Sequence, residues 1–88
     1  MLEYHAAYYP IEDGWYLARL LDFPGVVSQG QDLKSARLMI KDALRQMAEV
    51  TLEQGQPLPK PNPRARDRKA VRLEPIRLSI RILVPAVP

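Results

Sequence analysis

The stretch WYLARLLDFPGVVSQG, residues 15–30, decides the fold of this chain. Turn residues precede it at Glu12-Asp13-Gly14 and divide it at Pro24-Gly25. Residues 15–22 alternate with the period of a strand, and both of the resulting faces are largely apolar. We therefore predict a strand in the interior of a sheet, followed after a sharp corner by a short β-branched strand over residues 26–29.

Residues 2–10, upstream of this stretch, also alternate with a period of two and are rich in tyrosine, which suits a half-buried sheet surface. The Asp13-Gly14 pair readily adopts the positive φ angles that a hairpin turn requires. We expect the first two strands to form an antiparallel hairpin, which the third strand extends into a meander.

A helical period begins after Gly30. Asp32 is a good N-cap, because its carboxylate accepts hydrogen bonds from free backbone N–H groups. Gly55 is the expected residue just beyond the C-terminus, and Pro57 prevents continuation. The pattern predicts one amphipathic helix of about six turns that covers one face of the sheet. Its predicted buried residues are Leu33, Ala36, Ile40, Ala43, Leu44, Met47 and Ala48.

The remainder of the chain divides into two segments. Every second residue from Pro57 to Pro63 is proline, which favours a stiff polyproline II strap. Residues 71–87 again alternate like a strand, and Pro75 within them indicates an edge position, a bulge or two separate strands. The predicted fold class is α+β, an antiparallel sheet in β-β-β-α-β order. We divide the chain into a core (1–56), a strap (57–63) and a basic C-terminal strand that contacts the sheet or another copy (64–88).

Composition restricts the functional classes. A chain of 88 residues suits one small domain, and the absence of cysteine excludes disulfides, thiolate metal sites and a cysteine nucleophile. No apolar run approaches the ~18 residues of a membrane span, and the N-terminus has no signal-peptide pattern, so we expect a cytoplasmic protein. The charge is uneven, because residues 1–59 carry 5 basic and 8 acidic side chains (5 − 8 = −3), whereas residues 60–88 carry 8 basic and 2 acidic (8 − 2 = +6).

No catalytic centre is predicted. A metal-dependent nuclease needs several carboxylates around two cations, whereas Asp13 and Asp22 lie where turns favour Asp in any case. His5 has no recognisable nucleophile or orienting partner and is expected to be a half-exposed sheet residue. Ser28 lies at a strand end without the context of a nucleophile. We therefore expect a protein that is not an enzyme and has no cofactor and no metal site.

The C-terminal arginines allow two interpretations. Arg72, Arg77 and Arg81 are expected on one basic face that contacts nucleic-acid phosphates. Alternatively, these charges discourage unwanted pairing at the edge of the sheet. The aliphatic stripe between Ile76 and Val84 also predicts self-association, at least as a dimer, because it is too apolar to stay exposed.

The order and spacing of several motifs resemble the HicB-like antitoxin family. They are Glu12-Asp13-Gly14-Trp15-Tyr16, then Asp22-Phe23-Pro24-Gly25 through Gly30, then Asp32-Leu33 with Ala36, and finally Gly55 through Pro61. The resemblance covers about residues 3–61 and implies a partial ribonuclease-H-like fold without catalysis.

This resemblance also implies a function and a partner. It implies an antitoxin that blocks the active surface of a small, basic, mRNA-cleaving toxin of the HicA type. The negative charge of residues 1–59 would attract such a toxin. Longer members add a DNA-binding module, which is not expected to be complete here. The candidate contact residues for the toxin are Trp15, Asp22, Phe23 and Pro24, and the alternative for Trp15 and Phe23 is a place in the core.

Overall fold

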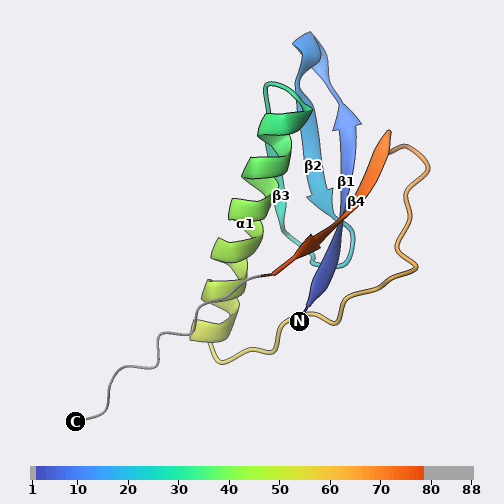
Figure 1. The fold of residues 1–88 in the computed structure, drawn as a ribbon. Coiled ribbons are helices and arrows are strands. Elements are labelled where there is room, and N and C mark those ends of the chain that lie inside the picture. The colour runs from blue at the N-terminus through green and yellow to red at the C-terminus, as the bar shows by residue number, and fades with distance from the viewer. Residues whose placement is uncertain (1, 79–88) are drawn as a thin grey trace.

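The structure, a computed structural model that describes residues 2–78, consists of a four-stranded antiparallel sheet with one helix on one face (Figure 1). The strand order across the sheet is β3-β2-β1-β4, so β3 and β4 form its two edges. This architecture confirms the predicted α+β class and the β-β-β-α-β order. The elements are β1 (Glu3–Pro10), a 3-10 turn (Glu12–Gly14), β2 (Tyr16–Leu20), β3 (Val27–Gly30), α1 (Leu33–Glu53) and β4 (Arg72–Arg77).

The β1–β2 hairpin forms around the predicted turn. Asp13 and Gly14 have φ angles of 58° and 78°, in the left-handed region that tight turns use. The Ile11 N–H donates to the Trp15 carbonyl at 2.8 Å and closes the hairpin. β2 is central, as predicted, but it ends at Leu20 because the chain then bends to direct Asp22 into the protein.

The core lies between α1 and the helix-facing side of the sheet. On β1 this side carries Tyr4, Ala6 and Tyr8, which alternate with residues on the opposite side. The rings of Tyr4 and Phe23 pack with centroids 5.2 Å apart. The helix contributes the buried residues Ala36, Ile40, Leu44 and Ala48.

Both predicted ends of α1 are confirmed. The Asp32 carboxylate accepts a hydrogen bond from the Ser35 backbone N–H at 2.7 Å, as an N-cap does. Gly55 follows the helix with a φ of 71°, which is the left-handed conformation expected there. The start of the helix lies directly on β3, because a Cβ atom at Gly30 would be only 2.3 Å from the backbone nitrogen of Ala36.

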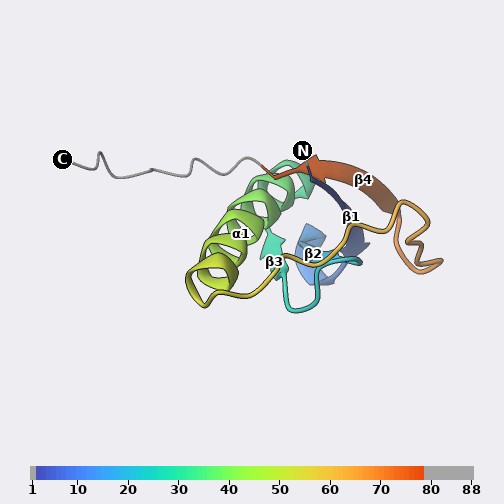
Figure 2. The same ribbon diagram turned by 90° about the horizontal axis from the view of Figure 1, so that it is seen from below.

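The connection between α1 and β4, residues 54–71, passes below the sheet to the side away from the helix (Figure 2). Two tyrosines of β1 bind the connection by hydrogen bonds, one from each side of the sheet. The Tyr4 hydroxyl donates to the Pro59 carbonyl at 2.6 Å, and the Tyr9 hydroxyl donates to Asp67 at 2.6 Å. Ala65 is buried, and so is Ala7 on the sheet side opposite the helix. The connection therefore covers the β1 part of this second face.

β4 confirms the predicted edge position of Pro75. The Leu78 N–H donates to the Leu2 carbonyl at 2.9 Å, so the even-numbered residues of β4 direct their backbone groups toward β1. Pro75, which is paired with His5, thus lies where an N–H would point away from the sheet. The predicted continuation of this strand over residues 79–87 lies outside the described residues.

Candidate functional site

A buried carboxylate joins three segments of the chain. Asp22 accepts hydrogen bonds from the His5 backbone N–H at 2.8 Å and the Asn62 backbone N–H at 2.9 Å, and its Oδ2 lies 2.7 Å from Nδ1 of His5. The Asp22 side chain is 1% exposed and that of His5 is 14% exposed. Burial by itself raises the pKa of Asp22, but the hydrogen bonds from His5 and Asn62 outweigh it and hold that pKa below its ordinary value.

This arrangement corrects the prediction for His5 and places Phe23 in the core, one of its two predicted positions. His5 has an orienting partner, Asp22, which the sequence separates from it, and His5 is mostly buried rather than half exposed. Phe23 is 3% exposed and packs on Tyr4. Because the Asp22 and Phe23 side chains both face inward, neither offers a contact surface to a partner in this conformation. Asp22 acts instead as an anchor for the connection to β4.

The part of the second sheet face that the connection leaves uncovered is apolar. It carries Trp15, Leu17 and Val27, which alternate with the core residues of β2 and β3. A hollow of about 520 Å³ opens beside Trp15, between Ile11 and Gln29. We name the surface formed by these five residues the open sheet face. A neighbouring hollow of about 350 Å³ includes Pro24, which is exposed.

Two carboxylates lie at the margin of the open sheet face. Glu12, which lines the hollow beside Trp15, and Asp13 are both exposed in the turn between β1 and β2. Neither forms an ion pair with another residue in the described part of the chain. A half-buried tryptophan that borders a hollow, next to uncompensated negative charge, suits contact with a basic protein surface.

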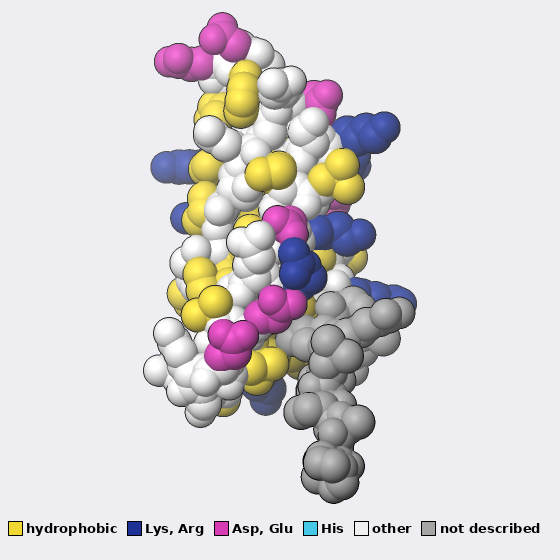
Figure 3. All heavy atoms as spheres, turned by 90° about the vertical axis from the view of Figure 1, so that its left-hand side faces the viewer, with side chains coloured by type: hydrophobic (Ala, Val, Ile, Leu, Met, Phe, Trp, Pro, Cys, Tyr) yellow, Lys and Arg dark blue, Asp and Glu magenta, His cyan; other side chains and the backbone are white. Residues whose placement is uncertain are grey.

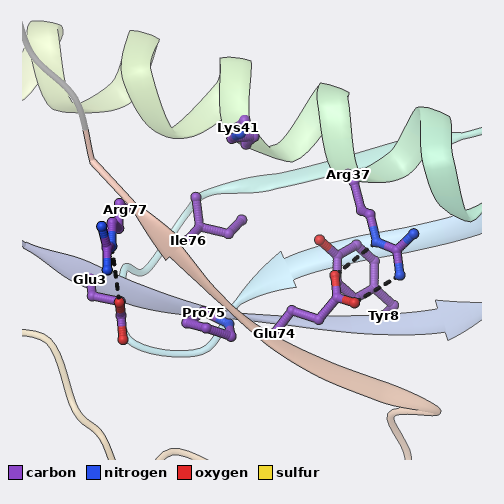
Figure 4. A pocket seen from close by; sticks show the side chains of 8 residues that line it. All are labelled: Glu3, Tyr8, Arg37, Lys41, Glu74, Pro75, Ile76 and Arg77. Atoms are coloured by element: carbon purple, nitrogen blue, oxygen red, sulfur yellow. Dashed lines mark hydrogen bonds and ion pairs between the residues drawn. The ribbon is translucent and has the colours of Figure 1, made fainter.

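A larger hollow, of about 590 Å³, lies between β4 and α1 (Figure 4). Arg37 reaches from α1 and donates to both carboxylate oxygens of Glu74, at 2.9 and 2.8 Å. At the other end of the hollow, Arg77 lies 3.6 Å from Glu3. Burial and the nearby Glu74 carboxylate raise the pKa of Tyr8 to about 12, so this phenol stays protonated. Arg37 is therefore compensated by Glu74, whereas the Arg77 side chain is 75% exposed and only loosely paired with Glu3.

The predicted common face for the C-terminal arginines is wrong for the two that the structure describes. Arg72 is paired in register with Tyr8, whose side chain faces the helix, whereas Arg77 is paired with Glu3 on the opposite side. Arg72 also lies 3.5 Å from Glu74. Arg81 lies outside the described residues. Nucleic-acid binding by Arg72, Arg77 and Arg81 therefore stays a prediction, without the shared face on which it was based.

Residues 2–78 contain neither a metal-binding cluster nor a membrane-spanning helix. Among residues 2–78, no three His, Asp or Glu side chains converge as metal ligands would. In the same part of the chain, α1 is too polar to span a bilayer and there is no other candidate helix.

The fold is that of a HicB antitoxin N-terminal domain. The crystal structure of this domain from Burkholderia pseudomallei aligns with a TM-score of 0.76 and 19% sequence identity, and the alignment covers 90% of this chain and 100% of that chain. A search of curated proteins found no match. The sequence model of the family described as "HicB_like antitoxin of bacterial toxin-antitoxin system" matches residues 3–83. The chain therefore belongs to the HicB-like antitoxin family, which confirms the family that its motifs predicted.

Proposed function

We propose that this antitoxin-family protein neutralises a small, basic, mRNA-cleaving toxin of the HicA type in the cytoplasm. It does so by covering the active surface of the toxin, and it carries out no chemistry of its own. Membership of the antitoxin family supports the general role. The HicA type of the toxin and the mode of inhibition are the parts that we propose.

The open sheet face is the observation that carries this proposal. It combines an accessible aromatic side chain, Trp15, with a hollow and with two carboxylates that have no partner in the described part of the chain, Glu12 and Asp13. Tryptophan is among the residues that dominate binding energies at protein interfaces, and acidic groups at the rim accelerate association with a basic partner. Of the predicted contacts, Trp15 and Pro24 are available for this role.

The experiment is a calorimetric titration of the chain with the HicA-type toxin encoded beside it, together with an RNA-cleavage assay of the mixture. We expect Trp15→Ala to weaken binding at least tenfold, because it removes the aromatic anchor. Glu12→Lys is expected to slow association, most clearly at low salt.

Two variants on the helix serve as controls. Leu52→Ala removes a hydrophobic side chain that is also exposed, and Glu53→Lys reverses an exposed charge in the last turn of α1. Both are expected to bind like the wild type. Unchanged affinity of Trp15→Ala would exclude the open sheet face as the contact surface, and absence of any binding or inhibition by the wild type would contradict the proposed function itself.

We also propose that the protein is a homo-oligomer, at least a dimer. A chain of 88 residues buries a small core, which association enlarges. Ile76 and Leu78, the first two residues of the predicted aliphatic stripe, are buried within the described chain, and the rest of the stripe lies outside the described residues.

A further inference from the structure

The outer edge of β3 carries backbone groups that point away from the sheet. The Leu20 N–H donates to the Val26 carbonyl at 3.0 Å, and the register continues through Ala18 and Ser28. Backbone direction alternates along a strand, so the N–H and C=O groups of Val27 and Gln29 face outward. These are the groups with which another strand would pair.

This edge is short, at four residues, but it carries no charged side chain, proline or bulge that would oppose pairing. Natural edge strands carry charged side chains, proline or bulges that discourage the addition of another strand. The sequence of β3 is Val-Ser-Gln-Gly, which contains neither charge nor proline, and its pairing with β2 is regular. The opposite edge, β4, has Pro75 at an outward-facing position and an arginine at each end. The two edges of the sheet therefore differ in their resistance to pairing: β4 carries proline and charge, whereas β3 carries neither.

An apolar stripe on α1 runs beside the β3 edge. Met39, Ala43, Met47 and Val50 recur at helical spacing beside the row of buried residues, and Ala43 and Met47 are half-buried against the core. Met39 is 49% exposed and Val50 is 45% exposed. Figure 3 looks onto the helix side of the molecule, where hydrophobic side chains lie at the surface among charged ones. A groove of about 300 Å³ separates this stripe from the strand, and every residue that lines it is uncharged: Gly25, Val26, Val27, Ala43, Gln46, Met47 and Val50.

We propose that a second copy of this chain docks here, with its own β3 added antiparallel to the first. A two-fold axis through Ser28 would place Val27 opposite Gln29 of the second copy, and each such pair would exchange both backbone hydrogen bonds. The helices lie on the same face of the joined sheet, so their stripes from Met39 to Val50 meet across the axis. The result is one continuous sheet that runs through both copies.

Charge identifies the second copy as the occupant. In a two-fold contact the same surface patch of both copies meets itself, so a patch of one charge sign repels itself, whereas an uncharged patch does not. The groove and the β3 edge are uncharged, which satisfies this condition. Symmetric pairing of β4 would instead bring Arg72 and Arg77 of two copies together. A basic toxin gains nothing from the neutral groove and is better matched by the acidic turn beside Trp15.

This inference rests on the proposed homo-oligomer, and because Val27 and Gln29 also belong to the open sheet face, it is tested on the chain alone, without toxin. The test measures the dissociation constant of the full chain by sedimentation, with folding checked by circular dichroism. Val27→Lys places a charge at the β3 edge, and Met39→Lys places a charge on the apolar stripe of α1. We expect each to weaken the dimer at least tenfold and the double variant at least a hundredfold.

The matched controls are Val71→Lys, beside β4, and Leu38→Lys, on the outer side of α1, which replace side chains that are 61% and 63% exposed. Both are expected to stay within twofold of the wild type.

Backbone amide exchange provides a measurement that needs no variant. The outward N–H groups of Val27 and Gln29 are expected to exchange more slowly as the protein concentration rises through the dissociation constant. A wild type that remains monomeric at millimolar concentration would overturn both the oligomer and this surface. A dimer that survives the double variant, or that Val71→Lys disrupts instead, would overturn the surface while leaving the oligomer intact. If the protein dimerises but amide exchange at Val27 and Gln29 is unchanged, the proposed surface would also be overturned.

Discussion

The two edges of the sheet are held in place by different physical interactions. β3 is fixed by close packing, since Gly30 allows the strand to lie directly against the backbone of α1 at Ala36. β4 is reached through the connection that Asp22 anchors, and it is joined to the helix by the Arg37–Glu74 pair. Close packing does not depend on the protonation of side chains, whereas carboxylate hydrogen bonds and ion pairs do.

This difference predicts how the two parts of the sheet respond to pH and salt. We call β3 with the helix residues packed on it the β3 half, and β4 with the connection that leads to it the β4 half. Acid and salt should weaken the β4 half selectively, because its contacts use Asp22, Asp67 and Glu74. The β3 half should keep its packing until the whole domain unfolds. The edge that is proposed to pair with a second copy is thus the one whose position is insensitive to pH. Three substitutions test this difference between the two edges.

Gly30→Ala is expected to have the largest effect. The added Cβ would lie 2.3 Å from the Ala36 backbone nitrogen and 2.7 Å from the Ser35 carbonyl carbon, so β3 and α1 must move apart. Overpacking of this kind should lower the free energy of unfolding by about 3 kcal/mol. Urea unfolding measures this loss in the free energy of unfolding, which should be the same at pH 7 and pH 4.5. The control is Gly55→Ala, where a φ of 71° is strained but no atom lies within 4 Å, with an expected loss of about 1 kcal/mol. Equal losses for the two variants would contradict the packing argument.

Asp22→Asn is expected to have the next largest effect, of about 2 kcal/mol, because it removes a buried charged acceptor from His5 and Asn62. The pKa of Asp22 is lowered in the folded state. Its stabilisation is therefore fully present above the unfolded pKa of about 3.9 and is lost as the pH falls through the lower folded pKa. The difference between variant and wild type should shrink below about pH 4. Asp13→Asn, at an exposed turn position that also suits Asn, is the control and should be neutral.

Amide exchange locates the effect of Asp22→Asn in the structure. The connection and β4 should exchange faster, while the amides of β3 that face β2 should change less. Uniform acceleration across both edges would show that Asp22 stabilises the domain as a whole, and the contrast between the two halves would then be lost.

The sequence predicts the architecture well because its signals are local. Alternation, the Asp13-Gly14 turn, the Asp32 cap and Gly55 each act within a few residues, and each is present where it was predicted. The family resemblance came from the same turns and caps, read in order. Pro75 indicated an edge because its missing N–H is tolerated only there, and β4 is an edge.

The candidate site is less predictable because its contacts are distant in sequence. Asp22 lies 17 residues from His5 and 40 from Asn62, and no local pattern connects them. The spacing of the arginines already contradicts their predicted common face. Residues 72 and 77 are an odd number of positions apart, so they lie on opposite faces of a strand. The second stripe on α1 was also readable, as Met39 and Val50 follow the helical period beside Ala43.

Glu74→Gln is expected to have the smallest effect, and it tests whether geometry decides the strength of the ion pairs at β4. Glu74 accepts both hydrogen bonds of a bidentate pair, and its side chain is 25% exposed, whereas Glu3 lies 3.6 Å from Arg77 and is 46% exposed. Hydrogen bonding to Arg37 lowers the pKa of Glu74, so its contribution is present at pH 7 and is lost as the pH falls through that lowered value. Because solvent screens part of the interaction, the loss should be well below that of Asp22→Asn and should diminish in 1 M salt. Glu3→Gln should give no measurable change in urea unfolding. If both substitutions cost the same, ion pairing alone, without bidentate geometry or burial, would account for the stability of this edge.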